Sequence, residues 1–222
     1  MSVGAHGAGP VADARVDDPV FTVLGVAPVE RGLLPGLRFD LHLSDPLGRR
    51  VLVLALSATI RIDPAQRAYD DATRARLVEL FGAPERWAAT TQAVHWATTD
   101  VLLDGFTGAT SFALDVPCGY DLEVSATKYL YSLPGGVAPL TFLFTGTVLY
   151  AGPEDRLQVA PVPWSALARW RMPVEAFRRA LAEHYPGGGW VRLSTETLDA
   201  LAARKADRGD HTFDATVRGL LA

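Results

Sequence analysis

The chain has little of several residue types that mark common protein classes. Its 222 residues include one cysteine, Cys118, so an internal disulfide and a cysteine-rich zinc site are both excluded. Two lysines stand against 19 arginines, and the formal net charge is −4. A chain of this charge lacks the basic field that phosphate backbones require, so we expect no nucleic-acid partner.

Long apolar runs and targeting segments are also missing. The most hydrophobic run, Val137–Tyr150, is shorter than the roughly 20 residues of a membrane-spanning helix, and it contains three threonines and a glycine. The first residues have no cationic start and no apolar stretch of the kind found in a secretory signal. These absences predict a cytoplasmic protein without a membrane span.

The pattern of residues changes twice along the chain. Residues 1–18 are rich in glycine, alanine and aspartate without periodicity, and they predict a disordered N-terminal tail. Residues 19–163 show mainly strand patterns, whereas residues 164–222 read as helices. We therefore expect an α+β fold, in which an antiparallel, sandwich-like core of about seven strands contains a helical insertion and carries a C-terminal helical cap.

The expected strands follow from alternation and turn signals. Leu37–Leu43 and Arg50–Ile62 alternate around Asp45-Pro46-Leu47-Gly48, which predicts a hairpin. The second of these strands is long, so we expect a bend or bulge near Ser57. Asp104-Gly105 predicts a turn. Further strands are expected at Val20–Val26, Ala93–Leu103, Ser111–Val116, Pro139–Tyr150 and Arg156–Val162.

Helices are expected where apolar residues recur at helical spacing between caps and stops. Tyr120–Leu133 fits either a strand or a helix, and Pro134-Gly135-Gly136 after it favours the helix. In the last helix we expect Phe213, Val217, Leu220 and Leu221 to point inward. The remaining helices are expected at Ala72–Phe81 with Asp71 as cap, at Trp164–Arg171, at Pro173–Tyr185, and from Ser194 to about Arg208.

The sequence contains no recognisable catalytic motif. Phosphate-binding glycine loops, a G-x-S-x-G nucleophile motif and histidine pairs at metal-binding spacing are all absent, so no cofactor, metal ligand or catalytic residue is assigned. Two residues leave an enzymatic alternative open. Cys118 precedes the expected helix, where a thiol can have a lowered pKa, and Lys128 could act as an amine nucleophile. Packing of a small thiol and of a lysine stem is the simpler explanation of both residues.

The aromatic residues suggest a binding surface. Tryptophans flank the ends of several expected elements, and tryptophan and tyrosine commonly anchor protein interfaces. The alternative is that these rings attach the helical cap to the sheet. The candidate binding residues are Trp87, Trp96, Cys118, Tyr120, Lys128, Tyr131 and Trp164.

Several short motifs resemble a family of uncharacterised actinobacterial proteins. They are Leu80-Phe81-Gly82-Ala83-Pro84-Glu85-Arg86-Trp87, Gly105-Phe106-Thr107-Gly108, Pro117-Cys118, Ala126-Thr127-Lys128-Tyr129-Leu130, Phe144-Thr145-Gly146-Thr147-Val148 and Pro161-Val162-Pro163-Trp164. The resemblance extends from residue 19 to the C-terminus. It implies no catalytic residues, but such genes often neighbour those of uptake [NiFe]-hydrogenases, which implies an accessory or assembly role.

We therefore expect a non-enzymatic accessory protein that binds a protein partner, with a hydrogenase component as the partner that the resemblance implies. One alternative is a chaperone-like domain that binds a peptide or small ligand in a groove between sheet and helices. The other is an enzyme that uses Cys118 or Lys128.

Overall fold

The computed structural model describes residues 17–30, 32–119, 125–189 and 191–222. The chain divides into two compact units, the first ending at Gly188 and the second comprising Gly189–Ala222. Residues 1–16 of the expected N-terminal tail lie outside the described part of the chain. Within that part, no helix is both long and apolar enough to cross a membrane.

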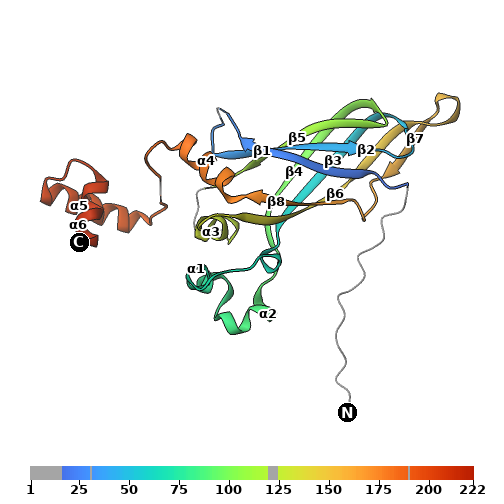
Figure 1. Ribbon diagram of the computed structural model, residues 1–222. Helices are drawn as coiled ribbons and strands as arrows, with labels where there is room; N and C mark the ends of the chain where they lie inside the picture. The colour runs from blue at the N-terminus through green and yellow to red at the C-terminus, as the bar shows by residue number, and fades with distance from the viewer. Residues whose placement is uncertain (1–16, 31, 120–124, 190) are drawn as a thin grey trace, which may run out of the picture. The chain divides into compact units, whose positions relative to one another are not determined.

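The first unit is built on two antiparallel sheets that pack face to face (Figure 1). One sheet has the strand order β1-β2-β5, and the other has the order β4-β3-β6, with β7 and β8 both pairing with the far side of β6. The expected α+β class with an antiparallel, sandwich-like core is confirmed. The strands are β1 (Val20–Pro28), β2 (Gly36–Ser44), β3 (Arg50–Ile62), β4 (Val94–Thr107), β5 (Ala109–Pro117), β6 (Val137–Ala151), β7 (Leu157–Pro161) and β8 (Leu167–Pro173).

The expected hairpin of Leu37–Leu43 with Arg50–Ile62 is wrong. β2 pairs with β1 and β5, whereas β3 pairs with β4 and β6, so the turn after β2 carries the chain from one sheet to the other. The buried Asp45 side chain fixes this connection, because it accepts hydrogen bonds from the backbone N–H of Leu47 and Arg49 and from the Arg49 guanidinium. A turn signal between two amphipathic strands fits either geometry.

A second crossing lies beside the first. β4 runs through Asp104-Gly105, where a turn was expected, and the chain changes sheets at Gly108, whose φ is 70°. The Asp45 N–H donates to the Gly108 carbonyl at 2.7 Å, and the Gly108 N–H donates to the Arg49 carbonyl at 3.3 Å. The two connections between the sheets therefore stabilise each other.

Strand β3 has irregularities, but not near Ser57 as expected. Its register against β6 shifts between Val51 and Val53, and its register against β4 shifts between Ile60 and Arg61. The first bulge lets Val51 and Leu54 both face the core and leaves Leu52 exposed.

The core lies between the two sheets and is rich in aromatic rings. Phe39 of β2 makes edge-to-face contacts with Trp96, Phe142 and Trp170, all of which come from the opposite sheet. Phe21 of β1 stacks on Phe144 of β6 with ring centroids 4.0 Å apart. Such ring pairs stabilise the contact between sheets beyond the burial of area alone.

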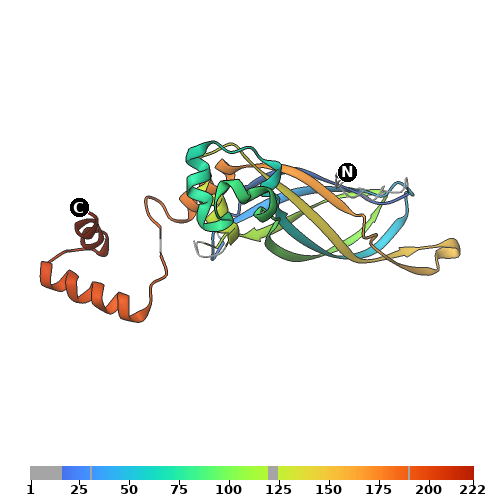
Figure 2. The ribbon, with the colours of Figure 1, turned by 90° about the horizontal axis from the view of Figure 1, so that it is seen from below.

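Helices gather at one end of the sandwich (Figure 2). α1 (Asp71–Phe81) follows the 3₁₀ turn η1 (Pro64–Gln66), and α2 (Trp87–Thr90) follows η2 (Pro84–Arg86). The cap of α1 is Asp70 rather than the expected Asp71, since the Asp70 carboxylate accepts from the Thr73 N–H at 2.7 Å. A further 3₁₀ turn, η3 (Pro153–Asp155), joins β6 to β7.

The helical interpretation of Tyr120–Leu133 is confirmed where the structure describes it. α3 spans Ser125–Ser132 and buries Ala126, Tyr129 and Leu130. Residues 120–124 lie outside the described residues. The Tyr129 hydroxyl lies 2.7 Å from that of Tyr69, so the buried phenol is hydrogen-bonded.

The helix expected at Trp164–Arg171 is wrong. Residues Leu167–Pro173 form strand β8, in which Ala168 and Met172 are buried at the period of two that a strand requires. α4 (Val174–His184) follows directly and buries Val174, Phe177 and Leu181 as expected. Both elements belong to the first unit, so the core continues past the expected boundary at residue 163.

The second unit is a pair of helices. α5 (Thr195–Arg208) is capped by Ser194 and ended by Gly209, and α6 (Phe213–Leu221) is capped by Thr212, all as the sequence predicts. The stripe expected to point inward on α6 is not covered by α5, because Phe213, Val217, Leu220 and Leu221 are exposed in this unit while Thr216 is buried. The expected cap comprised residues 164–222. For its last part, Gly189–Ala222, packing on the core stays a prediction.

Candidate functional site

The two sheets present very different outer faces. On β2 and β5 of the three-stranded sheet this face is polar: Arg38 donates two hydrogen bonds of 2.7 Å to Asp115, and His42 lies 3.2 Å from the Ser111 hydroxyl. The Arg38 guanidinium holds the pKa of Asp115 below its usual value through these bonds. A polar outer face is what an antiparallel sheet exposed to water normally shows. The edge strand β1 exposes two apolar residues, Val20 and Leu24.

The outer face of the five-stranded sheet carries apolar residues on each of the four neighbouring strands β4, β3, β6 and β7. Strand register places Leu102 of β4, Val53 of β3, and Leu149 and Val159 of neighbouring strands on this face, together with Leu157. Leu102 is 66% exposed and Val159 is 63% exposed. We call Val53, Leu102, Leu149, Leu157 and Val159 the outer apolar face. Contiguous apolar surface of this kind marks interaction sites in proteins.

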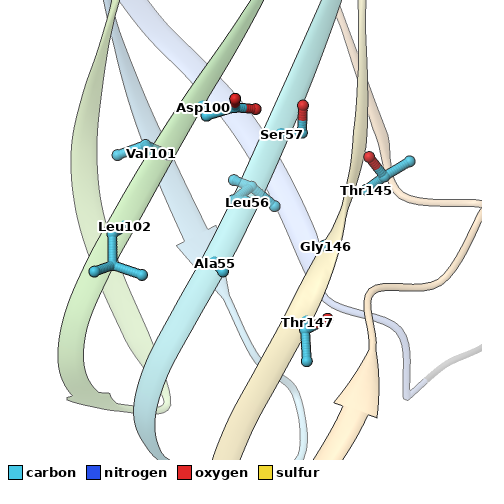
Figure 3. Close-up of a pocket in the computed structure, with 9 residues that line it drawn as sticks. All are labelled: Ala55, Leu56, Ser57, Asp100, Val101, Leu102, Thr145, Gly146 and Thr147. Atoms are coloured by element: carbon cyan, nitrogen blue, oxygen red, sulfur yellow. The ribbon is translucent and has the colours of Figure 1, made fainter.

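A hollow of about 410 Å³ lies beside the outer apolar face and shares Leu102 with it. Figure 3 shows the residues that line it on three adjacent strands, with the Asp100 carboxylate and the hydroxyl groups of Ser57, Thr145 and Thr147 around it. Its other lining residues are Ala55, Leu56, Val101 and Gly146. The hollow exists because small side chains of β3 and β6 lie between larger ones, so it can receive one projecting side chain.

Gly146 sets the close approach of β6 to β3 at this point. A Cβ atom there would lie 2.1 Å from the backbone oxygen of Ala55. On its other edge, the Gly146 carbonyl accepts from the Val162 N–H at 2.9 Å, and the Phe144 N–H donates to Ala166 at 3.0 Å. The loop between these two contacts carries Trp164, which is 81% exposed. Of the predicted binding residues, Trp164 is therefore at the edge of the apolar sheet.

The other two predicted tryptophans pack within the first unit. The Trp87 indole N–H donates to the Gly82 carbonyl at 2.8 Å, and its ring contacts Tyr69 and Phe81 edge-on. Trp96 contacts Phe39 with ring centroids 6.0 Å apart. Both rings are partly buried, and their contacts join elements of the fold.

Cys118 is poorly suited to nucleophilic chemistry. Its side chain is fully buried, and this burial raises the pKa of the thiol to about 12. The Sγ atom lies 3.8 Å from the Val116 carbonyl. Because the thiolate is the reactive form, almost none is available near neutral pH. The structure gives the Cys118 enzyme alternative no support.

The two described candidate residues of α3 have different surroundings. Lys128 forms an ion pair with Glu79 of α1 and thereby joins two helices. Tyr131 is 53% exposed and lines a cleft between α1, α3 and α4. Tyr120 lies outside the described residues. The predicted binding residues thus do not form one cluster in the part of the chain that is described.

Sequence reasoning missed the outer apolar face. Val53, Leu102, Leu149 and Val159 were assigned to strands, but strand assignment alone does not tell which sheet face is covered. One signal was available: both faces of Arg50–Ile62 carry apolar residues near its start, as expected of a strand whose second face also meets a partner. Among the residues described, no group of three or more histidine, cysteine or acidic side chains is placed to hold a metal ion.

Comparisons with known proteins supply a family but no activity. Residues 16–222 match DUF6084, described as a family of unknown function. No curated protein matches the sequence.

Similar solved structures are all distant. A protein assigned as late embryogenesis abundant (LEA) is 10% identical over 70% of each chain, with a TM-score of 0.30. A Bordetella pertussis protein assigned as ApaA is 12% identical over 70% of this chain and 92% of its own, with a TM-score of 0.24. β-Glucosidase 3B from Thermotoga neapolitana is 11% identical, with a TM-score of 0.25, and the match covers 69% of this chain but 17% of the enzyme. At these TM-scores the similarities carry no argument about function.

Proposed function

The chain belongs to DUF6084, a family of unknown function, and we propose that it is a protein-binding module whose partner docks on the five-stranded sheet. The observation that carries this proposal is the contrast between the two outer faces. The three-stranded sheet carries paired polar groups and exposes Val20 and Leu24 on its edge strand β1, whereas the five-stranded sheet has exposed apolar residues on both of its edge strands, Leu102 on β4 and Leu157 and Val159 on β7. Removing such side chains from water is favourable by about 25 cal/mol per Å² of apolar surface, and the entropy lost on association offsets part of this gain.

The geometry supports a docking mode with one anchor. A projecting apolar side chain of the partner enters the hollow beside Leu102. Residues of the partner on either side of this anchor contact the flatter surface of Leu149 and Val159. Asp100 and Asp104 of β4 border the face and form part of its polar rim. An apolar centre with a polar rim is the usual anatomy of a protein interface.

A hydrogenase component is the partner we propose to test first, in a cytoplasmic setting. This choice rests on the family resemblance and its gene neighbourhood, not on the geometry of the sheet. The physical proposal of a docking face stands independently of it.

The test is affinity capture from the native host with the full chain as bait, comparing wild type with Leu102→Asp and Leu24→Asp. Leu24 is 60% exposed on β1 of the other sheet, so Leu24→Asp is a matched control. We expect one set of proteins to be retained by wild type and Leu24→Asp and to be lost with Leu102→Asp.

Identical capture by all three proteins, with circular dichroism showing all three folded, contradicts the proposed face. Capture that depends on Leu102 but contains no hydrogenase component supports the face and rejects that partner.

A further inference from the structure

A second cleft lies among helices α1, α3 and α4, away from the sheet face. It has a volume of about 400 Å³. Its lining residues are Arg76, Tyr131, Phe177, Arg178, Leu181, Ala182 and Gly188. Phe177 and Leu181 are buried and form an apolar base, whereas Arg76, Tyr131 and Arg178 are exposed at its rim. This volume falls in the range of about 300–1,000 Å³ that is usual for small-ligand sites.

The charged groups of the cleft are all cationic. Arg76 and Arg178 line it, and no acidic side chain does. Glu79 lies three residues after Arg76 on α1, and its carboxylate forms an ion pair with Lys128. Among the described residues neither arginine forms a salt bridge within 4 Å, in contrast to Arg74 on the same helix, which pairs with Asp71. The two guanidinium groups therefore lie beside an apolar surface without a direct carboxylate partner in the described part of the chain, although the charge of Arg76 also acts at longer range on Asp70.

One of these guanidinium groups is already held in place. Arg178 Nη2 donates to the Leu133 carbonyl, just after the end of α3. A guanidinium has five N–H donors, so this bond leaves others available to a ligand. Tyr131 adds a phenolic hydroxyl on the same rim. A fixed guanidinium loses little freedom on binding, and its planar fork matches a carboxylate.

We propose that the cleft of α1, α3 and α4 binds an organic carboxylate that carries an apolar substituent. Arg76 and Arg178 bind the carboxylate, and Tyr131 donates a hydrogen bond. Leu181 and the exposed Ala182 contact the apolar part, above the fully buried Phe177. The same chemistry occurs in a free short-chain acid and at the C-terminus of a peptide. This site is separate from the sheet face and does not depend on the proposed function.

The experiment is a calorimetric titration of the full chain at neutral pH with octanoate and with N-acetylleucine, which represent the two sources. n-Octanol has the same tail as octanoate without the carboxylate, and inorganic phosphate is an anion without a tail. We expect octanoate or N-acetylleucine to bind at least about tenfold more tightly than either control, equivalent to about 1.4 kcal/mol.

Two variants connect binding to the cleft. We expect Arg76→Gln and Arg178→Gln each to weaken binding about tenfold, since each removes one cationic partner of the carboxylate. Arg179→Gln removes an exposed arginine of α4 that does not line the cleft, so its affinity should match wild type. Arg178 also holds the Leu133 carbonyl, but Arg76 has no such structural bond in the described part of the chain, so Arg76→Gln tests binding even if Arg178→Gln unfolds.

Absence of binding by both carboxylates overturns the proposal. The proposal is also overturned if octanol or phosphate binds as tightly as the carboxylates. An Arg76→Gln variant with the affinity of wild type overturns it as well. Because none of these substitutions touches the five-stranded sheet, failure here leaves the outcome of the Leu102 experiment unaffected.

Discussion

Gly146 lines the hollow and also allows β6 to lie close to β3, because it has no Cβ atom. A side chain at this position would place its Cβ 2.1 Å from the Ala55 oxygen, so β3 and β6 would have to separate. We expect Gly146→Ala to lower the thermal unfolding midpoint strongly and to reduce the yield of folded protein.

Gly25 in strand β1 provides the control, because a Cβ there meets no atom within 4 Å. Calorimetric midpoints of the two variants measure the difference. Equal midpoints would show that the strands can adjust at Gly146 without cost.

The buried thiol of Cys118 makes stability depend on pH in the alkaline range. Its pKa is raised by burial to about 12 in the folded chain, above an unfolded value near 9. The folded state therefore keeps a proton that the unfolded state loses, and stability falls as pH rises above about 9, with a limiting slope of about 1.4 kcal/mol per pH unit. We expect Cys118→Ala to reduce this slope between about pH 9 and pH 10.

Chemical denaturation at several pH values measures the slope. Burial also raises the pKa of Tyr129, so part of the alkaline loss should persist in the Cys118→Ala variant. A slope that is unchanged by the substitution would mean that the thiol titrates alike in both states.

The start of α1 is an element whose two candidate caps can be tested against each other. The sequence offers Asp70 and Asp71 side by side, and the structure uses Asp70, which accepts from the Thr73 N–H. We expect Asp70→Ala to lower the unfolding midpoint more than Asp71→Ala does, because it leaves a helix N–H without its partner. Hydrogen bonding by the Thr73 side chain and by its backbone N–H lowers the pKa of Asp70.

Its stabilising effect is therefore present above the unfolded pKa of an aspartate, and it is lost as acid protonates the folded carboxylate. The difference between the two variants should shrink in the acid range below about pH 4. Thermal melts of both variants at neutral and acid pH supply the comparison, and a larger effect of Asp71→Ala would reverse the assignment of the cap.

At the scale of elements, the sequence predicts strand and helix positions far better than strand partners. Alternation located β2 and β3, but the turn at residues 45–48 did not reveal that these strands join different sheets. The side-chain bonds of Asp45 to Leu47 and Arg49 are local, but its backbone N–H donates to the carbonyl of Gly108, a residue of the distant second crossing that the turn sequence does not reveal. β8 was also missed. Trp164–Arg171 was predicted as a helix, whereas Ala168 and Met172 follow the period of a strand.

The candidate site was less predictable than the fold. Trp164 was identified because it follows a proline at the end of an expected element, and the structure shows that it is exposed. Leu102 was not, since an exposed leucine in a strand looks like any core leucine until its neighbours are known. Cys118 and Lys128 attracted attention by rarity, yet rarity says nothing about burial or about pairing with Glu79.

At the scale of the molecule, the division at Gly188 separates units of very different burial. The first contains the large apolar core, whereas no side chain of α5 is buried within the described structure. We expect a chain ending at Gly188 to fold and to keep its thermal midpoint close to that of the full chain. Scanning calorimetry of the two proteins provides the test. A large drop in the midpoint would show that residues 189–222 stabilise the first unit.

The two adjacent crossings between the sheets also bear on how fast the chain finds its fold. The crossings send successive strands to different sheets. As a result, β2 pairs with β5 and β3 pairs with β6, and each partner lies many residues away along the chain. Proteins dominated by such distant pairings fold on the order of milliseconds to seconds. We expect the refolding signal of Trp96 and Trp170, whose rings meet Phe39 across the sheets, to appear in this late phase of stopped-flow fluorescence. Until both crossings close, the unpaired edges of these strands are open to other chains, so refolding yield should fall as protein concentration rises.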